Sequence, residues 1–184
     1  RRLGPREHQR ERYDDDERQE IAGENLGARH RDVASPVVVR LQQRVQLTQA
    51  EANVLREATE YKDAFELLGQ AVEKLPNVPE LLYDYALTAE KLEKFDLLES
   101  NLRKLIQVRP EHAHAYNALG YSFAERNTRL PEARKLIEKA LEISPEDYFI
   151  IDSMGWVLYR EGNLKGAAEQ LRRAYAGRPD AEIG

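Results

Sequence analysis

Cysteine is absent from the 184 residues of the chain, and tryptophan and methionine occur once each. Without cysteine, a disulfide framework and thiolate metal sites are excluded, while both the cytosol and the periplasm remain compatible. No apolar run approaches the roughly 18 residues that a membrane-spanning helix needs, so we expect no direct membrane insertion by this fragment. The formal net charge of −5 is small and argues against nucleic acid as a partner.

The beginning of the sequence lacks the marks of a leader. Its opening residues, RRLGPREHQRER, contain no apolar core of the kind that a signal peptide requires. Because the sequence does not start with methionine, we expect a fragment of a longer protein. An upstream targeting signal therefore stays open.

A catalytic or metal-binding constellation is also missing. Asp152 and Ser153 are neighbours without a histidine on the same predicted helix, and no Gly-x-Ser-x-Gly elbow occurs. His112 and His114 diverge by about 200° on a helix, unlike the i,i+4 pair of a zinc site. The other two histidines lie isolated near the N-terminus. We therefore predict that the protein is not an enzyme and uses no cofactor or metal.

Residues 1–35 form a charged N-terminal tail in which acidic and basic residues are mixed. Their apolar residues are scattered and form no helical stripe, so burial cannot offset the entropy of ordering. The acidic run Asp14–Glu17 lacks the alternating ligands and the glycine turn of a calcium loop. We expect the tail to be disordered or to be a helix docked on another surface.

From Pro36 onward, apolar residues recur at spacings of three and four, and no strand-like alternation is sustained. Prolines return at steps of 34, 35 and 34 residues, at Pro76, Pro110, Pro145 and Pro179. A small residue recurs upstream of each proline, at Ala52, Ala86, Gly120 and Gly155. This periodicity predicts an all-α chain of repeated helix pairs, at about 42–58 with 61–74, 79–92 with 95–107, 113–126 with 131–143, and 147–160 with 164–176.

Two of the recurring small residues are glycines inside predicted helices. A glycine there costs about 1 kcal/mol relative to alanine. Gly120 and Gly155 are therefore explained if the second helix of each pair crosses closely at those points. We expect these crossings at Ala133 and Ala167, which lie 12 residues before Pro145 and Pro179.

The period and the stretches NALGYSFAERNTRLPEARKLIEKALEISP and SMGWVLYREGNLKGAAEQLRRAYAGRP resemble the tetratricopeptide repeat (TPR). The resemblance implies a superhelical stack of hairpins, an α-solenoid, whose core lies between neighbouring repeats. We expect this domain at 36–179, with repeats at about 45–78, 79–112, 113–147 and 148–181. Residues 180–184, DAEIG, are expected to begin a further helix that is cut off.

In the family, the first helix of each pair lines the concave side of the stack. The corresponding track here combines aromatic and polar side chains, which suits the capture of an extended peptide or a helix. The candidate groove residues are Tyr83, Leu87, Asn117, Tyr121, Asp152, Trp156, Tyr159 and Arg160. The same track reaches Glu90 or Lys91 in the second repeat, and Gln49, Asn53 and Arg56 or Glu57 in the first.

An alternative interpretation is that Tyr121 and Trp156 pack against a neighbouring repeat, and we favour the groove. Some members of the family hold a C-terminal carboxylate with lysine and asparagine at fixed groove positions. Of the residues at those positions here, only Asn117 is suitable, which argues against that mode of binding.

Residues 49–183 also resemble the C-terminal repeats of large proteobacterial outer-membrane lipoproteins, in stretches such as PELLYDYALTAEKL and AYNALGYSFAERN. This resemblance implies a bacterial adaptor on the periplasmic side of the outer membrane, and the alternative compartment is the cytoplasm. The expected function is a non-enzymatic scaffold for a protein or peptide partner. The alternative is a structural module of a larger repeat protein, whose groove is filled by its own chain or by self-association.

The last predicted helix has no polar capping helix after it, although terminal repeats usually need one. Leu171 and Tyr175 are expected to stay exposed on its outer face. We therefore expect a homo-oligomer, or a docked segment, at the C-terminal repeat.

Overall fold

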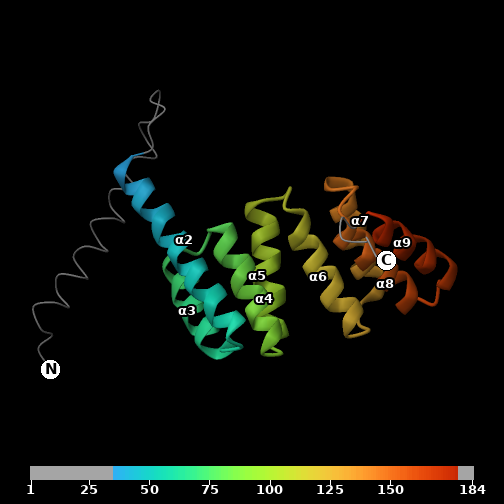
Figure 1. Cartoon of the computed structure of the whole chain (residues 1–184), viewed down its shortest axis with the longest axis horizontal. Helices are drawn as coiled ribbons and strands as arrows, with labels where there is room; N and C mark the ends of the chain where they lie inside the picture. Colours follow the sequence, from blue (N-terminus) through green and yellow to red (C-terminus); the bar gives the residue numbers. More distant parts are fainter. Residues whose placement is uncertain (1–34, 178–184) are drawn as a thin grey trace, which may run out of the picture. The chain divides into compact units, whose positions relative to one another are not determined.

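The computed structural model describes residues 35–177, in which eight α-helices and no strand are found. The helices are α2 (Pro36–Glu57), α3 (Tyr61–Lys74), α4 (Pro79–Lys91), α5 (Phe95–Val108), α6 (Ala113–Glu125), α7 (Leu130–Ile143), α8 (Tyr148–Arg160) and α9 (Leu164–Ala176). Figure 1 shows them in chain order, from blue to red. The all-α prediction is confirmed. The expectations for the charged tail, apart from Ser35, and for residues 180–184 concern residues outside the described part.

The chain divides into two units, Arg1–Leu47 and Thr48–Gly184. In the first unit the described residues form the beginning of α2, which starts at Pro36 and not near residue 42 as predicted. The Val38 N–H donates to the Ser35 hydroxyl oxygen at 3.4 Å, so a serine caps the helix. Proline is tolerated in the first turn because its missing N–H has no intrahelical partner there.

In the second unit, consecutive helices pack into hairpins, and each hairpin packs on the next. α4 contacts α5, α6 contacts α7, and α8 contacts α9, while α3–α4, α5–α6 and α7–α8 join neighbouring hairpins. The first helices α6 and α8 also touch each other directly. The fold therefore repeats one supersecondary unit whose apolar faces are buried by its neighbours.

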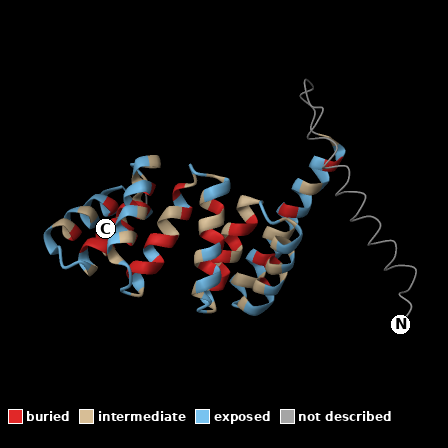
Figure 2. Cartoon of the chain, turned by 180° about the vertical axis from the view of Figure 1, so that it is seen from behind, coloured by how far each residue is buried: buried red, intermediate tan, exposed pale blue. Residues whose placement is uncertain are grey.

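The core runs between these hairpins and is built mainly of leucine, isoleucine and alanine. Leu98, Leu102 and Leu105 on α5 are fully buried, and so is Phe123 on α6. Figure 2 shows the buried positions in red along the helices of this unit. The recurring alanines Ala52, Ala86, Ala133 and Ala167 likewise lie in the interior.

The two mid-helix glycines are sites of close helix crossing, as predicted. A Cβ atom at Gly120 would lie 2.8 Å from the Ala133 carbonyl oxygen and 2.8 Å from Ile137 Cγ1. A Cβ atom at Gly155 would lie 3.4 Å from the Ala167 carbonyl oxygen and 2.8 Å from Leu171 Cγ. Glycine is required at these positions because the second helix of each hairpin occupies the space of a side chain.

The four first helices end in the same turn. Each turn contains one residue at positive φ: Thr59 (60°), Glu93 (58°), Asn127 (53°) and Gly162 (84°). In each case the next backbone N–H reaches back five residues, as from Lys94 to the Ala89 oxygen at 2.9 Å. This is the Schellman arrangement, which satisfies carbonyl groups at the helix end and favours glycine. Only Gly162 of these four residues is a glycine, so the shared turn is not evident from the sequence.

The 35-residue step between Pro110 and Pro145 is accommodated in the loop between α6 and α7, which is one residue longer than the corresponding loops. Arg129 adopts a left-handed conformation there, with φ of 47°, at the N-cap of α7. Its guanidinium carbon lies 3.8 Å from the centre of the Phe123 ring. The same side chain forms an ion pair with Glu99 on α5. The longer loop therefore ties together two hairpins.

Candidate peptide-binding groove

A hollow of about 260 Å³ lies across the first helices α4, α6 and α8, and we call it the α4–α6–α8 pocket. Its lining residues are Leu87, Glu90, Asn117, Ala118, Tyr121, Phe149, Asp152 and Ser153. Four of the eight predicted groove residues are among them. Each of these four residues lies either three positions before or one position after the recurring small residue of its repeat. They come together because successive first helices present the same face.

Tyr121 lines this pocket and is partly open to solvent, with 38% of its surface exposed. Burial raises the pKa of its phenol, and the nearby carboxylates of Glu125, Asp152 and Glu90 raise it further. The pKa of the Glu90 carboxyl is also raised, chiefly by burial. The pocket is therefore a partly desolvated, electronegative site.

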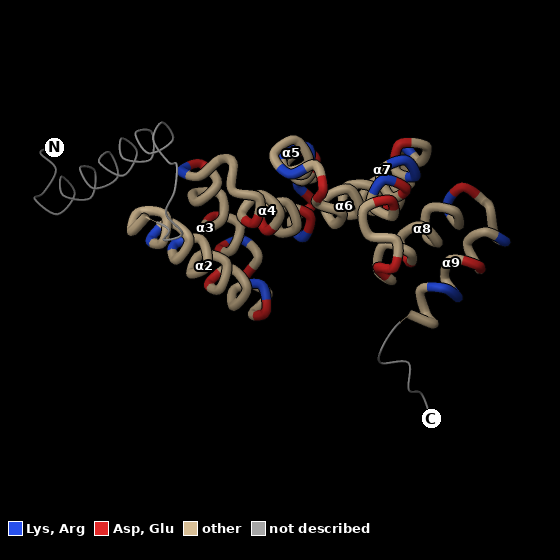
Figure 3. The backbone as a smooth tube through the Cα atoms, turned by 90° about the horizontal axis from the view of Figure 1, so that it is seen from above, with Lys and Arg blue, Asp and Glu red and all other residues tan. Residues whose placement is uncertain are grey.

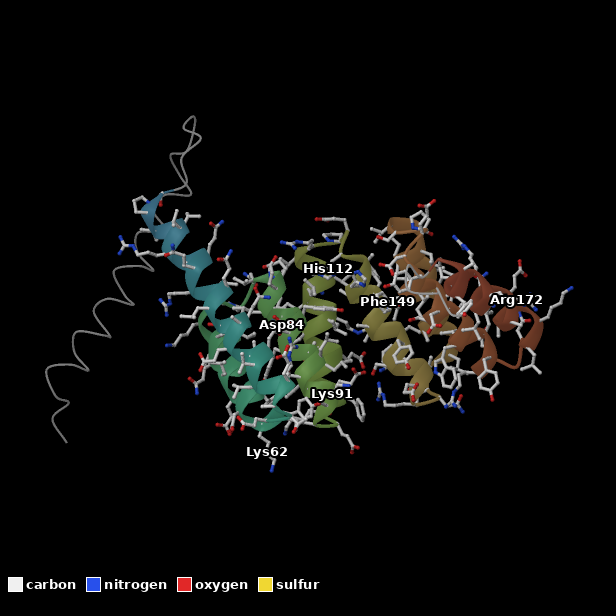
Figure 4. The ribbon with its side chains drawn as sticks, in the orientation of Figure 1. Lys62, Asp84, Lys91, His112, Phe149 and Arg172 are labelled. Carbon is white, nitrogen blue, oxygen red and sulfur yellow. The ribbon has the colours of Figure 1, made fainter. Side chains whose placement is uncertain are left out.

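Phe149 is a pocket residue that the sequence analysis missed. It lies in the first turn of α8, is 56% exposed and is labelled in Figure 4. Asp147 caps this helix, because its Oδ1 accepts from the Phe149 N–H at 2.9 Å. The neighbouring Tyr148 ring lies 4.3 Å from the Phe149 ring, centre to centre. An aromatic pair directly after a capping aspartate is the signal that could have found it.

Trp156, Tyr159 and Arg160 form a separate cluster near the C-terminal end of α8. The Trp156 and Tyr159 rings stack at 5.4 Å, and the Arg160 guanidinium lies 5.5 Å from the centre of the Trp156 ring. Arg160 also donates to the Glu125 carbonyl oxygen at 3.2 Å. Trp156 is half-buried and packs against the core. The sequence predicted the same role for Tyr121 and Trp156, but their positions differ. Tyr121 lines the pocket, whereas Trp156 packs against the core.

Tyr83 is the remaining predicted residue, and it too lies against the core rather than in the pocket. Its ring is 5.3 Å from the His112 ring. Burial raises the pKa of its phenol, with further contributions from Asp84 and Glu90. Tyr83 therefore contributes to the packing between two neighbouring repeats.

Three buried polar atoms of the predicted groove residues have no hydrogen-bond partner within the described residues. They are Asn117 Oδ1, Trp156 Nε1 and Arg160 Nε. Buried polar groups are normally paired, and an unpaired one in a native protein calls for an explanation. Asn117 lines the pocket itself, so an unpaired acceptor belongs to the pocket wall.

A second hollow of about 450 Å³ lies between the first two repeats and is lined by Asn53, Arg56, Glu57, Tyr61, Leu87 and Lys91. Its charges are mixed. Beside it, Asp84 is 8% exposed and accepts from Gln49 Nε2 at 2.8 Å and from Arg56 Nη2 at 3.3 Å. A buried carboxylate needs such partners, so part of this track is occupied by a structural network. Asp84 and Lys91 are labelled in Figure 4.

The two histidines of the described part have structural positions. His112 caps α6, since its Nδ1 accepts from the Ala115 N–H at 3.1 Å. His114 Nε2 lies 3.3 Å from Asp147 Oδ2. Among residues 35–177 no group of three His, Cys, Asp or Glu side chains is arranged to hold a metal ion. None of the described helices combines the length and the apolar character needed to cross a membrane.

Comparison with known sequences agrees with the repeat. Residues 99–148 match the family model of the tetratricopeptide repeat. Over 139 residues the chain is 40% identical to the TPR repeat-containing protein PA4667 of Pseudomonas aeruginosa. The matched region is 76% of this chain and 24% of that protein, so the chain spans about a quarter of the relative's length.

Solved structures with the same fold share little sequence. MamA of Desulfovibrio magneticus RS-1 is 18% identical with a TM-score of 0.63, covering 73% of this chain and 76% of MamA. The type IV pilus biogenesis factor PilW is 21% identical with a TM-score of 0.68, covering 74% and 63%. The first TPR of Spaghetti (RPAP3), solved with the HSP90 peptide SRMEEVD, is 20% identical with a TM-score of 0.60, covering 65% and 94%.

The helix pairs, their packing order and these likenesses together define the class of the protein. The described helices form an all-α solenoid of tetratricopeptide repeats. The α4–α6–α8 pocket lies on the first helices of this solenoid.

Proposed function

We propose that the chain is a non-enzymatic interaction scaffold that binds a peptide or a helix of a partner protein across α4, α6 and α8. The observation that carries this proposal is the pocket to which three successive repeats contribute side chains. It combines exposed aromatic rings with polar groups, the composition of sites that anchor peptides. One protein of the same fold was solved with a bound peptide, which shows that such a stack is able to hold one.

The role of an adaptor in the bacterial envelope, on the periplasmic side of the outer membrane, is part of the same proposal. It rests on the resemblance of residues 49–183 to lipoprotein repeats, and the cytoplasm is the alternative compartment. The Pseudomonas relative is consistent with a bacterial setting.

The test is selection of binders from a random linear peptide library on the wild-type chain. Selected peptides are then measured by fluorescence anisotropy against wild type and Tyr121→Ala, with circular dichroism confirming that the variant is folded. We expect Tyr121→Ala to weaken binding by about tenfold or more, as for an anchor residue. Tyr175→Ala is the matched control, because Tyr175 is an exposed tyrosine on α9. Equal binding by wild type and Tyr121→Ala would refute the groove as the binding site.

A second candidate function is a structural module whose groove is filled by other repeats of a longer chain. The length of the Pseudomonas relative favours this second function. Most of that protein lies outside the matched region, so a longer chain of this kind has further segments that could fill the groove. In that case library selection on this chain yields peptides that resemble segments of the longer protein itself. Selected sequences unrelated to that protein would contradict this second function.

A further inference from the structure

We propose that the α4–α6–α8 pocket takes a lysine or arginine side chain, so that the partner of this scaffold presents a basic segment. This inference rests on the function proposed above and adds the chemistry of the ligand. It is argued from the size of the pocket, the charges of its walls and the positions of the nearby cations.

The volume of the pocket matches a side chain better than a small molecule. Small-molecule sites usually measure about 300–1,000 Å³, whereas this pocket measures about 260 Å³ and is open to solvent along one side. Two aromatic residues, Tyr121 and Phe149, are among its lining residues. A single long side chain entering from a bound peptide would lie along these two rings.

The charge of the walls has one sign. Glu90 from α4 and Asp152 from α8 line the pocket, and none of its lining residues is lysine or arginine. Glu125 adds a third carboxylate close to the Tyr121 phenol, whose pKa it raises together with Asp152 and Glu90. A cation would be attracted to these carboxylates and to the faces of the aromatic rings.

The two basic side chains that lower the pKa of Glu90, those of Lys91 and Arg126, are not among the residues that line the pocket. Lys91 lines the neighbouring 450 Å³ hollow. The Arg126 guanidinium carbon lies 4.3 Å from the centre of the Phe95 ring, and its Nε donates to the Ser122 carbonyl oxygen at 3.0 Å. Both side chains therefore act on Glu90 from outside the pocket, whose lining residues include no lysine or arginine.

The polar atoms of the pocket fit the same ligand. The pocket walls carry carboxylates, from Glu90 and Asp152, which are acceptors. Lysine and arginine side chains are donors only, so a guanidinium or an ammonium group complements these carboxylates. An acidic ligand side chain would instead add a like charge beside Glu90, which is already desolvated.

The experiment uses the peptides selected from the random library and keeps only those whose binding is weakened by Tyr121→Ala. We expect these peptides to share a lysine or arginine at one position, and replacement of that residue by the neutral isostere citrulline or by glutamine to reduce affinity about tenfold. If Tyr121-dependent peptides share no basic residue, the inference is overturned while the groove function stands. If no selected peptide depends on Tyr121, the proposed function fails as well.

Isosteric variants of the protein test the walls. We expect Glu90→Gln and Asp152→Asn together to weaken the basic peptide about tenfold and to reduce the salt dependence of its binding. Glu57→Gln is the control, because Glu57 lines the other hollow. The acidic peptide SRMEEVD serves as a second probe, and we expect it to bind more weakly than the selected peptide. Equal loss of binding in the control variant, or equal affinity for SRMEEVD, would overturn the inference.

Discussion

Gly120 and Gly155 occupy the same position in two successive first helices, but their surroundings differ. The Gly120 position faces a backbone oxygen and the fully buried Ile137, while the Gly155 position faces chiefly the side chain of Leu171. Leu171 is 40% exposed and so has room to move. The same substitution should therefore have different consequences at the two sites.

We predict that Gly120→Ala lowers the free energy of unfolding by about 1–3 kcal/mol, as overpacking of a core does, and that Gly155→Ala lowers it less. Equilibrium denaturation of both variants by urea gives the comparison. If helix propensity alone governed these positions, both variants would be more stable than wild type by about 1 kcal/mol, and that result would contradict the close crossing.

The turn residues at positive φ give a second prediction at the residue scale. Gly162 has φ of 84° and nothing within 4 Å of an added Cβ, so Gly162→Ala changes only the backbone energy. We expect a loss of about 1 kcal/mol. Glu93 has φ of 58°, and we expect Glu93→Gly to be neutral or stabilising. Thermal unfolding followed by circular dichroism measures both, and a stabilising Gly162→Ala would contradict the left-handed turn.

At the scale of elements, an ion-pair network joins α5 to α7 and to the loop before it. Figure 3 shows acidic and basic positions on both helices. Arg103 Nε lies 2.9 Å from Glu99 Oε1, and Arg103 Nη2 lies 2.6 Å from Glu132 Oε1. Arg129 pairs with Glu99 as well. Hydrogen bonding from Arg129 is the largest cause that lowers the pKa of the Glu99 carboxyl from 4.5 to about 2.

This network predicts a pH dependence of stability. Because the folded pKa of Glu99 is below its unfolded value, its contribution is complete above pH 4.5 and disappears as the pH falls toward 2. We expect Glu99→Gln to cost roughly 1 kcal/mol near neutral pH, after allowance for partial exposure, and to cost nothing near pH 2. The control is Glu138→Gln, which removes an exposed i,i+4 pair with Arg134. A difference that does not vary with pH would contradict the assignment.

The helices could be predicted from the sequence more fully than the residues that line the pocket. The spacing of the prolines and glycines locates the helix pairs, because it follows from a steric requirement that recurs in the repeats. The second helix crosses close to the first, at Ala133 in one repeat and at Ala167 in the next. The sequence alone could not distinguish the role of Tyr121 from that of Trp156, because both residues directly follow the recurring glycine of their repeat. Trp156 is covered by Tyr159 and Arg160, whereas the corresponding positions in α6 are alanine and glutamate. That difference depends on side-chain contacts rather than on the period.

At the scale of the whole molecule, an apolar stripe on α9 stays exposed in the described structure. Leu164, Leu171 and Tyr175 lie on this helix, and Tyr175 is 52% exposed. We predict that the chain self-associates through α9, because exposed apolar patches mark interaction surfaces. Multi-angle light scattering should show a dimer or larger species that Leu164→Lys with Tyr175→Ser converts to monomer. A monomer at high concentration for wild type would contradict the prediction.

At the same scale, side chains from three repeats line one pocket, and this shared surface is the centre of the proposal. The most direct measurement is NMR titration of the folded chain with a library-selected peptide, with backbone amide shifts mapped on the structure. We predict that the largest shifts lie at Leu87, Ala118, Tyr121, Phe149 and Asp152, from α4, α6 and α8. Shifts confined to the second helices α5, α7 and α9 would contradict a binding site on the first helices.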